Sequence, residues 1–212
     1  MWIMEQYKVL RRPNYNIIID SRSVIIKPIT DYELSETYLS WLNNIETNQY
    51  LEVRHEFQTK ESVVNYINNL RKREGLEMFA IYDKKKNVHI GNLTITSFNN
   101  HDNGVVDFGL MIGDEDSRKR GAGGEIHICF LEFIFSLRNV LRINANVASE
   151  NKVALKTLKS IGYIQEGIRR KCFPLENGEK CDVVYFGMLK EEWNNRKDKF
   201  KMFLNYINIH SK

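Results

Sequence analysis

The residues most suited to chemistry lie in one stretch, residues 107–137, which reads DFGLMIGDEDSRKRGAGGEIHICFLEFIFSL. Three glycines, Gly121, Gly123 and Gly124, separate a polar turn from a long apolar segment with helical character. The first N–H groups of a helix have no partner within the helix and carry the positive end of its dipole. Glycine lets a backbone approach a phosphate without a Cβ atom in the way. The stretch therefore predicts a pyrophosphate site at the start of a helix.

The spacing of the cations and glycines selects among the known phosphate loops. Arg118, Lys119 and Arg120 precede the glycines, and no Lys-Ser or Lys-Thr pair follows them, so the Walker A pattern is absent. The dinucleotide fingerprint G-x-G-x-x-G fails because its third glycine position is Ile126. The pattern that fits is Arg-x-x-Gly-x-Gly, from Arg118 to Gly123. The simpler alternative is a flexible strand-to-helix turn with a solvated basic rim.

This loop resembles the acetyl-coenzyme A loop of the GCN5-related N-acetyltransferase (GNAT) superfamily. Residues Asn151 to Ala154, followed by Gly162-Tyr163, are similar to the N-x-x-A…G-[FY] segment of the same superfamily. The resemblance covers residues 23–190 and implies that acetyl-coenzyme A is a co-substrate and that no metal takes part. It assigns coenzyme binding to Met111, Ile112, Gly113, Arg118, Lys119, Arg120, Gly121, Ala122, Gly123, Gly124, Asn151 and Lys156.

Two further segments narrow the resemblance to one branch. Residues 38–44 (YLSWLNN) are similar to the first helix of a branch that includes ribosomal-protein N-terminal acetyltransferases and bacterial nucleotide-amino-sugar acetyltransferases. Residues 182–189 (DVVYFGML), followed by Glu192-Trp193, are similar to the last strand of that branch. The branch implies direct transfer of an acetyl group to a primary amine.

Acetyl transfer needs a group that takes the amine proton and a group that protonates the leaving thiolate. We expect Asp107 to be the base, since related proteins often carry a carboxylate on the corresponding strand; otherwise it is an exposed surface carboxylate. Many family members carry a tyrosine acid at the position of Leu158, so Tyr185 is our substitute for that acid. Gly109 and Gly113 would permit a departure from regular strand pairing, which frees backbone groups for the thioester and the pantetheine amides.

The acceptor is expected to bind at residues 48–57. Asn48, Tyr50, Arg54 and His55 offer amide hydrogen bonds, one aromatic face and one planar cation, which are the groups that a nucleotide diphosphate uses. In the alternative reading, Tyr50 packs inward and Arg54 is solvated. With the basic run Arg169-Arg170-Lys171, these residues favour a nucleotide-linked amino sugar. A protein N-terminus, a small amine, or a non-catalytic coenzyme-binding module remain as alternatives.

The composition predicts one domain over residues 1–212. At 42% hydrophobic residues the chain can bury one good core, and a formal charge of +4 is too small and scattered to imply nucleic acid. Three cysteines without C-x-x-C spacing, and the lack of a signal sequence, indicate a cytoplasmic chain with reduced thiols. The apolar helix at 127–137 is short for a membrane span. A homodimer remains open.

The elements that must position these residues follow from hydrophobic periodicity and turn signals. We expect a mixed, mostly antiparallel central sheet with helices on both faces in an α+β fold, with a core at 23–190. The strands are expected at 16–19, 24–27, 77–82, 88–98, 105–112, 143–147, 163–172 and 180–189. The helices are expected at 30–45, 59–75, 121–137 and 152–161, with an amphipathic C-terminal helix at 191–209.

Overall fold

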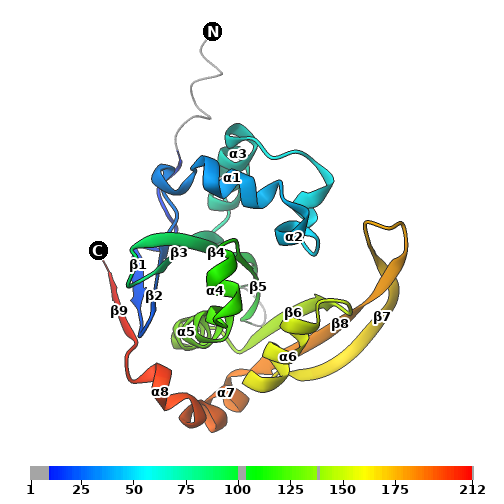
Figure 1. Ribbon diagram of the computed structural model, residues 1–212. Coiled ribbons are helices and arrows are strands. Elements are labelled where there is room, and N and C mark those ends of the chain that lie inside the picture. Colours follow the sequence, from blue (N-terminus) through cyan, green and yellow to red (C-terminus); the bar gives the residue numbers. More distant parts are fainter. Residues whose placement is uncertain (1–9, 100–103, 138, 212) are drawn as a thin grey trace.

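A central sheet organises the protein in a computed structural model that describes residues 10–99, 104–137 and 139–211 (Figure 1). Within the described residues it has nine strands in the order β7-β8-β6-β5-β4-β3-β2-β1-β9. Their bounds are β1 (Ile17–Asp20), β2 (Val24–Pro28), β3 (Glu77–Asp83), β4 (Val88–Asn99), β5 (Val105–Ile112), β6 (Arg142–Ala148), β7 (Ile164–Pro174), β8 (Lys180–Leu189) and β9 (Asn208–Ser211). Neighbouring strands are antiparallel except β5 and β6, which are parallel. The expected mixed, mostly antiparallel sheet is confirmed.

Helices cover both faces of this sheet. Phe79 of β3 packs against Phe130 of α5 (Ala122–Ser136), with ring centroids 6.1 Å apart. The preceding residue, Met78, accepts a contact from the Tyr38 hydroxyl of α1 (Glu36–Leu42) at 3.7 Å. Successive residues of a strand point to opposite faces, so α1 and α5 lie on opposite sides of the sheet. The expected α+β fold with helices on both faces is therefore confirmed (Figure 1).

The parallel pair β5 and β6 diverges soon after it forms. The two strands pair only over residues 105–107 of β5 and 142–144 of β6. β5 then continues to Ile112 and β6 to Ala148 with no pairing between them among the described residues. The edge of β5 that faces β6 therefore keeps backbone N–H and C=O groups without a strand partner. This opening ends next to the glycine loop that leads into α5.

The first helical region differs from the single helix expected at 30–45. It consists of a 3₁₀ helix η1 (Asp31–Glu33), α1, and α2 (Ile45–Asn48). The Ser35 side chain accepts from the backbone N–H of Tyr38 at the start of α1, and Asn44 accepts from that of Glu46 at the start of α2. Each of these side chains caps the N-terminus of a new helix. The chain therefore starts a new short helix at each of them, although its apolar residues keep one helical spacing throughout. The next helix, expected at 59–75, is α3 (Lys60–Arg71).

The C-terminal region also differs from the expected amphipathic helix at 191–209. It forms α7 (Lys190–Arg196), η3 (Lys197–Phe200), α8 (Lys201–Leu204) and then β9. The expected apolar spacing does anchor it, since Trp193 is fully buried and its indole N–H donates to Glu132 of α5 at 2.8 Å. The chain then turns into a strand because β1 offers an open edge, along which β9 pairs at four positions.

Candidate active site

The glycine loop between β5 and α5 presents an open helix N-terminus. The chain leaves β5, forms α4 (Glu115–Lys119), and starts α5 at Gly121, whose φ of 77° is left-handed and favours glycine. A Cβ atom at Gly121 or Gly124 would meet nothing within 4 Å, and one at Gly123 would meet only the tip of Ile112, at 3.4 Å. The start of α5 is therefore free to be approached by a phosphate group, which fits the diphosphate of coenzyme A.

Arg118, the first residue of the Arg-x-x-Gly-x-Gly pattern, holds the loop in place. Its Nη1 atom donates to the carbonyl oxygens of Ile112 and Gly113, both at 2.9 Å, and approaches the Thr47 hydroxyl at 3.4 Å. These bonds tie the end of β5 to α4 and to α2. The side chain therefore has a structural role in the loop, in addition to whatever charge it offers to a ligand.

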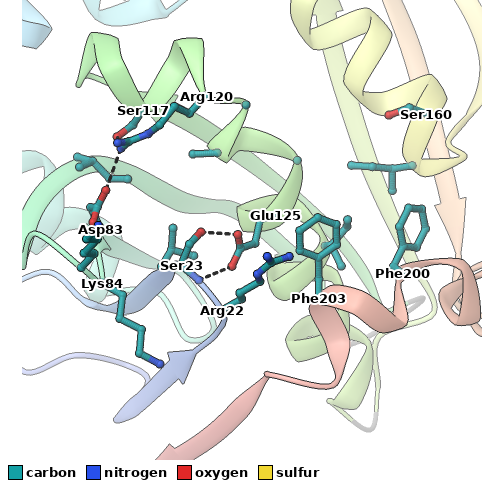
Figure 2. Close-up of a pocket in the computed structure, with 18 residues that line it drawn as sticks. Arg22, Ser23, Asp83, Lys84, Ser117, Arg120, Glu125, Ser160, Phe200 and Phe203 are labelled. Carbon is teal, nitrogen blue, oxygen red and sulfur yellow. Dashed lines mark hydrogen bonds and ion pairs between the residues drawn. The ribbon is translucent and has the colours of Figure 1, made fainter.

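The other two cations of the loop are also engaged. Lys119 pairs with Glu115 at 2.6 Å, and both side chains are exposed. Arg120 pairs with Asp83, the last residue of β3, at 2.8 Å (Figure 2). The sequence predicted three cations facing the phosphates, and the structure instead gives each of them a partner. The open backbone N–H groups of α5 are thus the better placed anion donors at this loop.

Gly113, Met111 and Trp41 form the wall of the opening on the side of α1. A Cβ atom at Gly113 would lie 1.9 Å from the Trp41 ring, so this position has room only for glycine while Trp41 packs here. The N–H of Gly113 donates to the carbonyl of Ile90 at 2.9 Å. Met111 is buried and pairs with Asn92 of β4. Sequence reasoning did not assign Trp41 to the site because a tryptophan at helical spacing is normally a core residue.

The second coenzyme segment starts α6 (Lys152–Ile161). The Asn151 side chain accepts from the N–H of Ala154 at 3.1 Å and so caps the helix. Lys156 is exposed on the same helix. Leu158, at the position where many family members have a tyrosine, is 4% exposed and belongs to the core. Asn151 and Lys156 therefore lie on the helix after β6, on the far side of the opening from the glycine loop.

The neighbours of Asp107 decide which face of the sheet its carboxylate occupies. The adjacent Phe108 ring lies 4.9 Å from His127 and 4.8 Å from Phe130, both on α5. Because alternate residues of a strand face opposite ways, Asp107 points to the face of α1, α2 and α3. It pairs with Asn144 at the last position before β5 and β6 diverge. The carboxylate therefore lies at the closed end of the opening.

The departure from regular pairing that was expected around Gly109 and Gly113 lies on the side of β6, because β5 and β6 stop pairing after Asp107. Gly109 pairs regularly with Thr94 of β4. The recorded irregularity lies in β4 between Ile95 and Ser97, opposite Phe108 and Asp107. The extra residue belongs to the partner strand, where no glycine marks it in the sequence.

Tyr185 shares a face of the sheet with Asp107. Asp107 pairs with Asn144, Asn144 pairs with Gly187 of β8, and Tyr185 is two residues from Gly187 on the same strand. Cross-strand partners share a face, as do residues two apart. β6 thus lies between the strands that carry the two side chains, and Tyr185 is offset from Asp107 by two residues along the strands. The guanidinium of Arg169 lies 5.2 Å over the Tyr185 ring.

Arg54 connects the expected acceptor segment to β7. Its guanidinium lies 4.3 Å over the ring of Phe173, and its Nη2 atom donates to the carbonyl of Pro174 at 3.2 Å. Its Nη1 atom donates at 2.6 Å to the carbonyl of Leu51, the residue that precedes η2 (Glu52–His55). The Tyr50 ring lies 6.4 Å from the same Phe173. Residues 45–55, which we call the strap, therefore contact the end of the β7–β8 hairpin.

The two remaining acceptor candidates, Asn48 and His55, differ in their burial. Asn48 is 5% exposed, its Nδ2 atom donates to Leu42 at 2.6 Å, and its Oδ1 atom has no hydrogen-bond partner within the described residues. His55 is exposed on the outside of the strap. The structure thus brings Tyr50 and Arg54 together at Phe173, buries Asn48 against Leu42, and leaves His55 exposed.

His127 is the most strongly perturbed base near the site. Complete burial lowers its pKa to about 3, so the ring is neutral at physiological pH. Its Nε2 atom lies 2.9 Å from the Tyr163 hydroxyl, and burial raises the pKa of that phenol. A neutral histidine bonded to a buried tyrosine suits core packing between α5 and β7 and places no proton carrier in the opening.

No group of three or more His, Cys, Asp or Glu side chains is arranged to hold a metal ion in the part of the chain that the structure describes. None of the helices in that same part combines the length and the apolar character needed to cross a membrane.

A parallel strand pair that diverges beside an open glycine loop defines the class of acetyltransferases that the sequence resembled. The family model for the acetyltransferase (GNAT) domain matches residues 23–164. The chain therefore belongs to the GNAT family and is an N-acetyltransferase.

The chain is similar to proteins described as uncharacterised N-acetyltransferases. It is 28% identical over 137 residues to YnaD of Bacillus subtilis (strain 168), covering 64% of this chain and 77% of the relative. It is 24% identical over 165 residues to p20 of Bacillus licheniformis, covering 77% and 91% of the two chains.

Solved structures agree on the fold. A GCN5-related N-acetyltransferase from Brucella melitensis has a TM-score of 0.72 at 19% identity, covering 92% of this chain and 88% of that one. Spermidine N-acetyltransferase from Vibrio cholerae, in complex with CoA and spermine, also has a TM-score of 0.72 at 19% identity, covering 82% and 99% of the two chains. At these identities the likeness shows the fold alone.

Proposed function

We propose that this N-acetyltransferase transfers the acetyl group of acetyl-coenzyme A directly to the primary amine of a small molecule. The observation that carries the proposal is the opening between β5 and β6 beside the bare start of α5. The coenzyme supplies an activated thioester when it is bound. The unpaired edge of β5 offers N–H and C=O groups to an extended ligand that carries amides, in the manner of an added strand. The open N–H groups of α5 suit its diphosphate.

The proton-handling residues face the same side of the sheet. Asp107, at the closed end of the opening, holds the proton that the acceptor amine gives up as it attacks. Tyr185, on β8 two strands away from β5, donates a proton to the departing thiolate. Their positions on the face of the strap support this assignment, because the acceptor amine and the thiol must both reach the end of the opening. Leu158, which is buried and apolar, has no proton to offer.

For the acceptor we propose a nucleotide-linked amino sugar. Arg169 supports this choice, since its guanidinium lies over Tyr185 and forms no ion pair within the described residues. An unpaired arginine near the reacting end suits the diphosphate of such an acceptor. The aromatic faces of Tyr50 and Phe173 at the strap offer stacking surfaces for the base. Polyamines, amino-terminal peptides and free amino sugars are the competing acceptors.

Release of free thiol from acetyl-coenzyme A with a panel of amines tests this proposal. The panel contains a uridine-diphosphate amino sugar, the same amino sugar without the nucleotide, spermidine and a peptide with a free N-terminus. We expect the highest kcat/KM for the nucleotide-linked sugar. A preference for spermidine or for the peptide would overturn the acceptor and leave the transferase intact. Coenzyme binding without turnover of any amine would indicate a non-catalytic module.

Arg169→Ala sharpens the test of the acceptor, with Arg170→Ala as the matched control. The neighbouring Arg170 has the same charge, but it is the guanidinium of Arg169 that lies over the Tyr185 ring. Loss of a charged hydrogen bond changes binding by about tenfold or more, so Arg169→Ala should raise KM for the nucleotide-linked sugar by that factor. KM for the free amino sugar should stay unchanged in both variants. Equal effects of the two substitutions would point to a general charge effect.

A further inference from the structure

A row of polar positions crosses the sheet from Asp107 toward β7. Asp107 pairs with Asn144 of β6, and Asn144 pairs with Gly187 of β8. Cross-strand partners share a face of the sheet, so these three positions lie side by side on one face. Arg142 comes two residues before Asn144 on β6 and faces the same way. The row therefore begins at the closed end of the opening, where we place the proton of the acceptor amine.

Glu166 of β7 fixes the guanidinium of Arg142. The Nη1 atom of Arg142 donates to Oε1 of Glu166 at 2.9 Å, and its Nη2 atom donates to Oε2. Such a two-pronged pair sets the direction of the planar guanidinium as well as its place. The third donor atom, Nε, faces Asn144, whose Oδ1 atom accepts from it at 2.7 Å. Glu166, Arg142 and Asn144 thus form one connected network.

Gly187 leaves the space in which this ion pair lies. A Cβ atom at Gly187 would lie 2.5 Å from Nη2 of Arg142 and 2.6 Å from Oε1 of Glu166. The backbone of Gly187 is not left-handed, so the need for space accounts for the glycine. The pair therefore lies over β8, next to Asn144. Its two side chains are 28% and 41% exposed, so solvent screens their charges only in part.

The bond from Arg142 also orients the amide of Asn144. Because Oδ1 accepts from the guanidinium, the amide group must turn its NH2 group away from Arg142. This NH2 group donates no hydrogen bond within the described residues. The neighbouring position on the adjacent strand is Asp107. The network therefore leaves one free amide donor beside the carboxylate that we propose as the base.

The charges of the network reach Asp107 as well. The hydrogen bonds to Glu166 raise the pKa of Arg142, burial opposes this rise, and the carboxylates of Glu192 of α7 and of Asp107 add to it. The other titratable group on this face is the phenol of Tyr185. A nearby cation favours the ionised form of a carboxylate. Substrates that fill the opening displace water, which strengthens this attraction.

We propose that Arg142 is a positioning residue for Asp107, and that Glu166 and Asn144 set where its charge and the amide donor lie. The inference rests on the proposed role of Asp107 as the base, and adds the residues that keep its carboxylate ionised and oriented once both substrates are bound. A base can accept a proton only in its ionised form, so the network determines the pH at which the enzyme becomes active.

The dependence of kcat on pH tests this inference, because it reports the complex with both substrates. Arg142→Gln removes the cation and leaves the Glu166 carboxylate, so the acid limb of the profile should move to higher pH by about 0.5–1 unit. Glu166→Gln leaves the cation without its partner, so the acid limb should move to lower pH. Both substitutions break the same ion pair. A purely structural pair would therefore give shifts in one direction or none.

Two further variants separate charge from packing. The double variant Arg142→Gln with Glu166→Gln restores the net charge of the pair, so its acid limb should return close to that of the parent. Arg142→Lys keeps the charge and loses the two-pronged geometry, so it should keep the limb and lower kcat. Arg170→Gln is the matched control, since Arg170 is an exposed arginine of β7, and it should leave the profile unchanged.

The outcomes distinguish this inference from the proposed function. Shifts in the same direction for Arg142→Gln and Glu166→Gln, or no shift in either, would overturn the role of Arg142 while Asp107 stands as the base. A nearly normal kcat in Asp107→Asn would remove the base and this inference with it. If urea unfolding shows that Arg142→Gln does not fold, Glu166→Gln decides alone: a lower limb supports the inference and an unchanged limb overturns it.

Discussion

At the scale of single residues, charge and residue type did not predict which partner a side chain takes in the fold. Arg118, Lys119 and Arg120 look like three equivalent phosphate ligands in the sequence, yet each has a partner in the fold. Arg54, expected either to bind phosphate or to be solvated, is held over Phe173. A charged side chain takes whichever partner the fold brings within reach, and the sequence does not reveal that partner.

Asp107→Asn should lower kcat by about a hundred- to ten-thousandfold, as for the loss of a general base. The substitution keeps the size of a side chain that lies at the strand edge of the opening, so coenzyme affinity should be unchanged. Steady-state kinetics and calorimetry on the same preparation check both expectations. A nearly normal kcat would mean that solvent or another residue takes the amine proton.

His127 should make the protein less stable as the pH falls. Burial lowers its pKa to about 3, below the value of about 6.5 in an unfolded chain, so the unfolded state binds more protons between these two values. The resulting loss between pH 7 and pH 5 is about 2 kcal/mol in the free energy of unfolding. Over the same pH interval, the free energy of unfolding of the His127→Gln variant should fall by about 2 kcal/mol less than that of the parent protein. Urea unfolding at both pH values measures the difference, and parallel losses would contradict the assignment.

At the scale of elements, the site results from how two pairs of segments meet. β5 and β6 separate after three paired positions, which creates the opening. The strap reaches the end of the β7–β8 hairpin through the contacts of Arg54 with Pro174 and Phe173. We propose that the first pair serves the coenzyme and the second the acceptor, so substitutions in them should separate the two affinities.

Gly123→Val should weaken coenzyme binding by at least tenfold with little effect on folding. The added side chain enters the space where the phosphates approach, while inside the protein its Cβ atom meets only the flexible tip of Ile112, at 3.4 Å. Valine and glycine differ little in helix propensity, so the free energy of unfolding should change by less than about 1 kcal/mol. Calorimetry with coenzyme A and thermal unfolding test the two parts. Unchanged affinity in a folded variant would remove the loop from the coenzyme site.

Arg54→Ala should raise KM for the nucleotide-linked amino sugar by about tenfold and leave that for acetyl-coenzyme A unchanged. The substitution removes the bond to Pro174 and the contact with Phe173, so the strap loses its hold on the hairpin. Glu52→Gln, an exposed change in the same 3₁₀ helix, is the control and should alter neither constant. A parallel rise in both constants would show that the strap also shapes the coenzyme side.

At the scale of the whole molecule, the C-terminal region completes both the core and the sheet. It lies beyond residues 23–164, which match the family model, and yet it buries Trp193 and adds β9 to the edge of β1. Phe200 and Phe203 of the same region line a cavity beside the coenzyme loop (Figure 2). The stability of the fold therefore depends on this region.

Trp193→Ala should lower the free energy of unfolding by about 3–5 kcal/mol, as for other large-to-small changes of aromatic core residues. The indole is fully buried, stacks on Phe200 and donates to Glu132, all of which the substitution removes. Tyr206→Ala, at a position 60% exposed, is the control and should change it by less than about 0.5 kcal/mol. Equal effects of the two substitutions in urea unfolding would contradict the role given to this region.

The sequence by itself determined the family, the α+β class and eight of the nine strands that the described residues form. Periodicity and caps act over a few residues, so a strand such as 105–112 and a helix such as 152–161 were predicted with the bounds that the structure has. The loop at Gly121 and Gly123 was also readable, because a backbone approached by phosphate needs glycine at fixed positions. The acceptor, the homodimer and the cytoplasmic location stay predictions.

Only the tertiary structure decided the features that depend on residues far apart in the chain. The side of the sheet on which Asp107 lies follows from the contact of Phe108 with α5. The chain forms the strand β9 where the end of the C-terminal helix was expected, because β1, about 190 residues earlier in the chain, offers an open edge. The partner of Arg54 lies on another hairpin, at Phe173. A pattern of a few residues carries no information about such partners, because they are chosen when the sheet brings distant segments together.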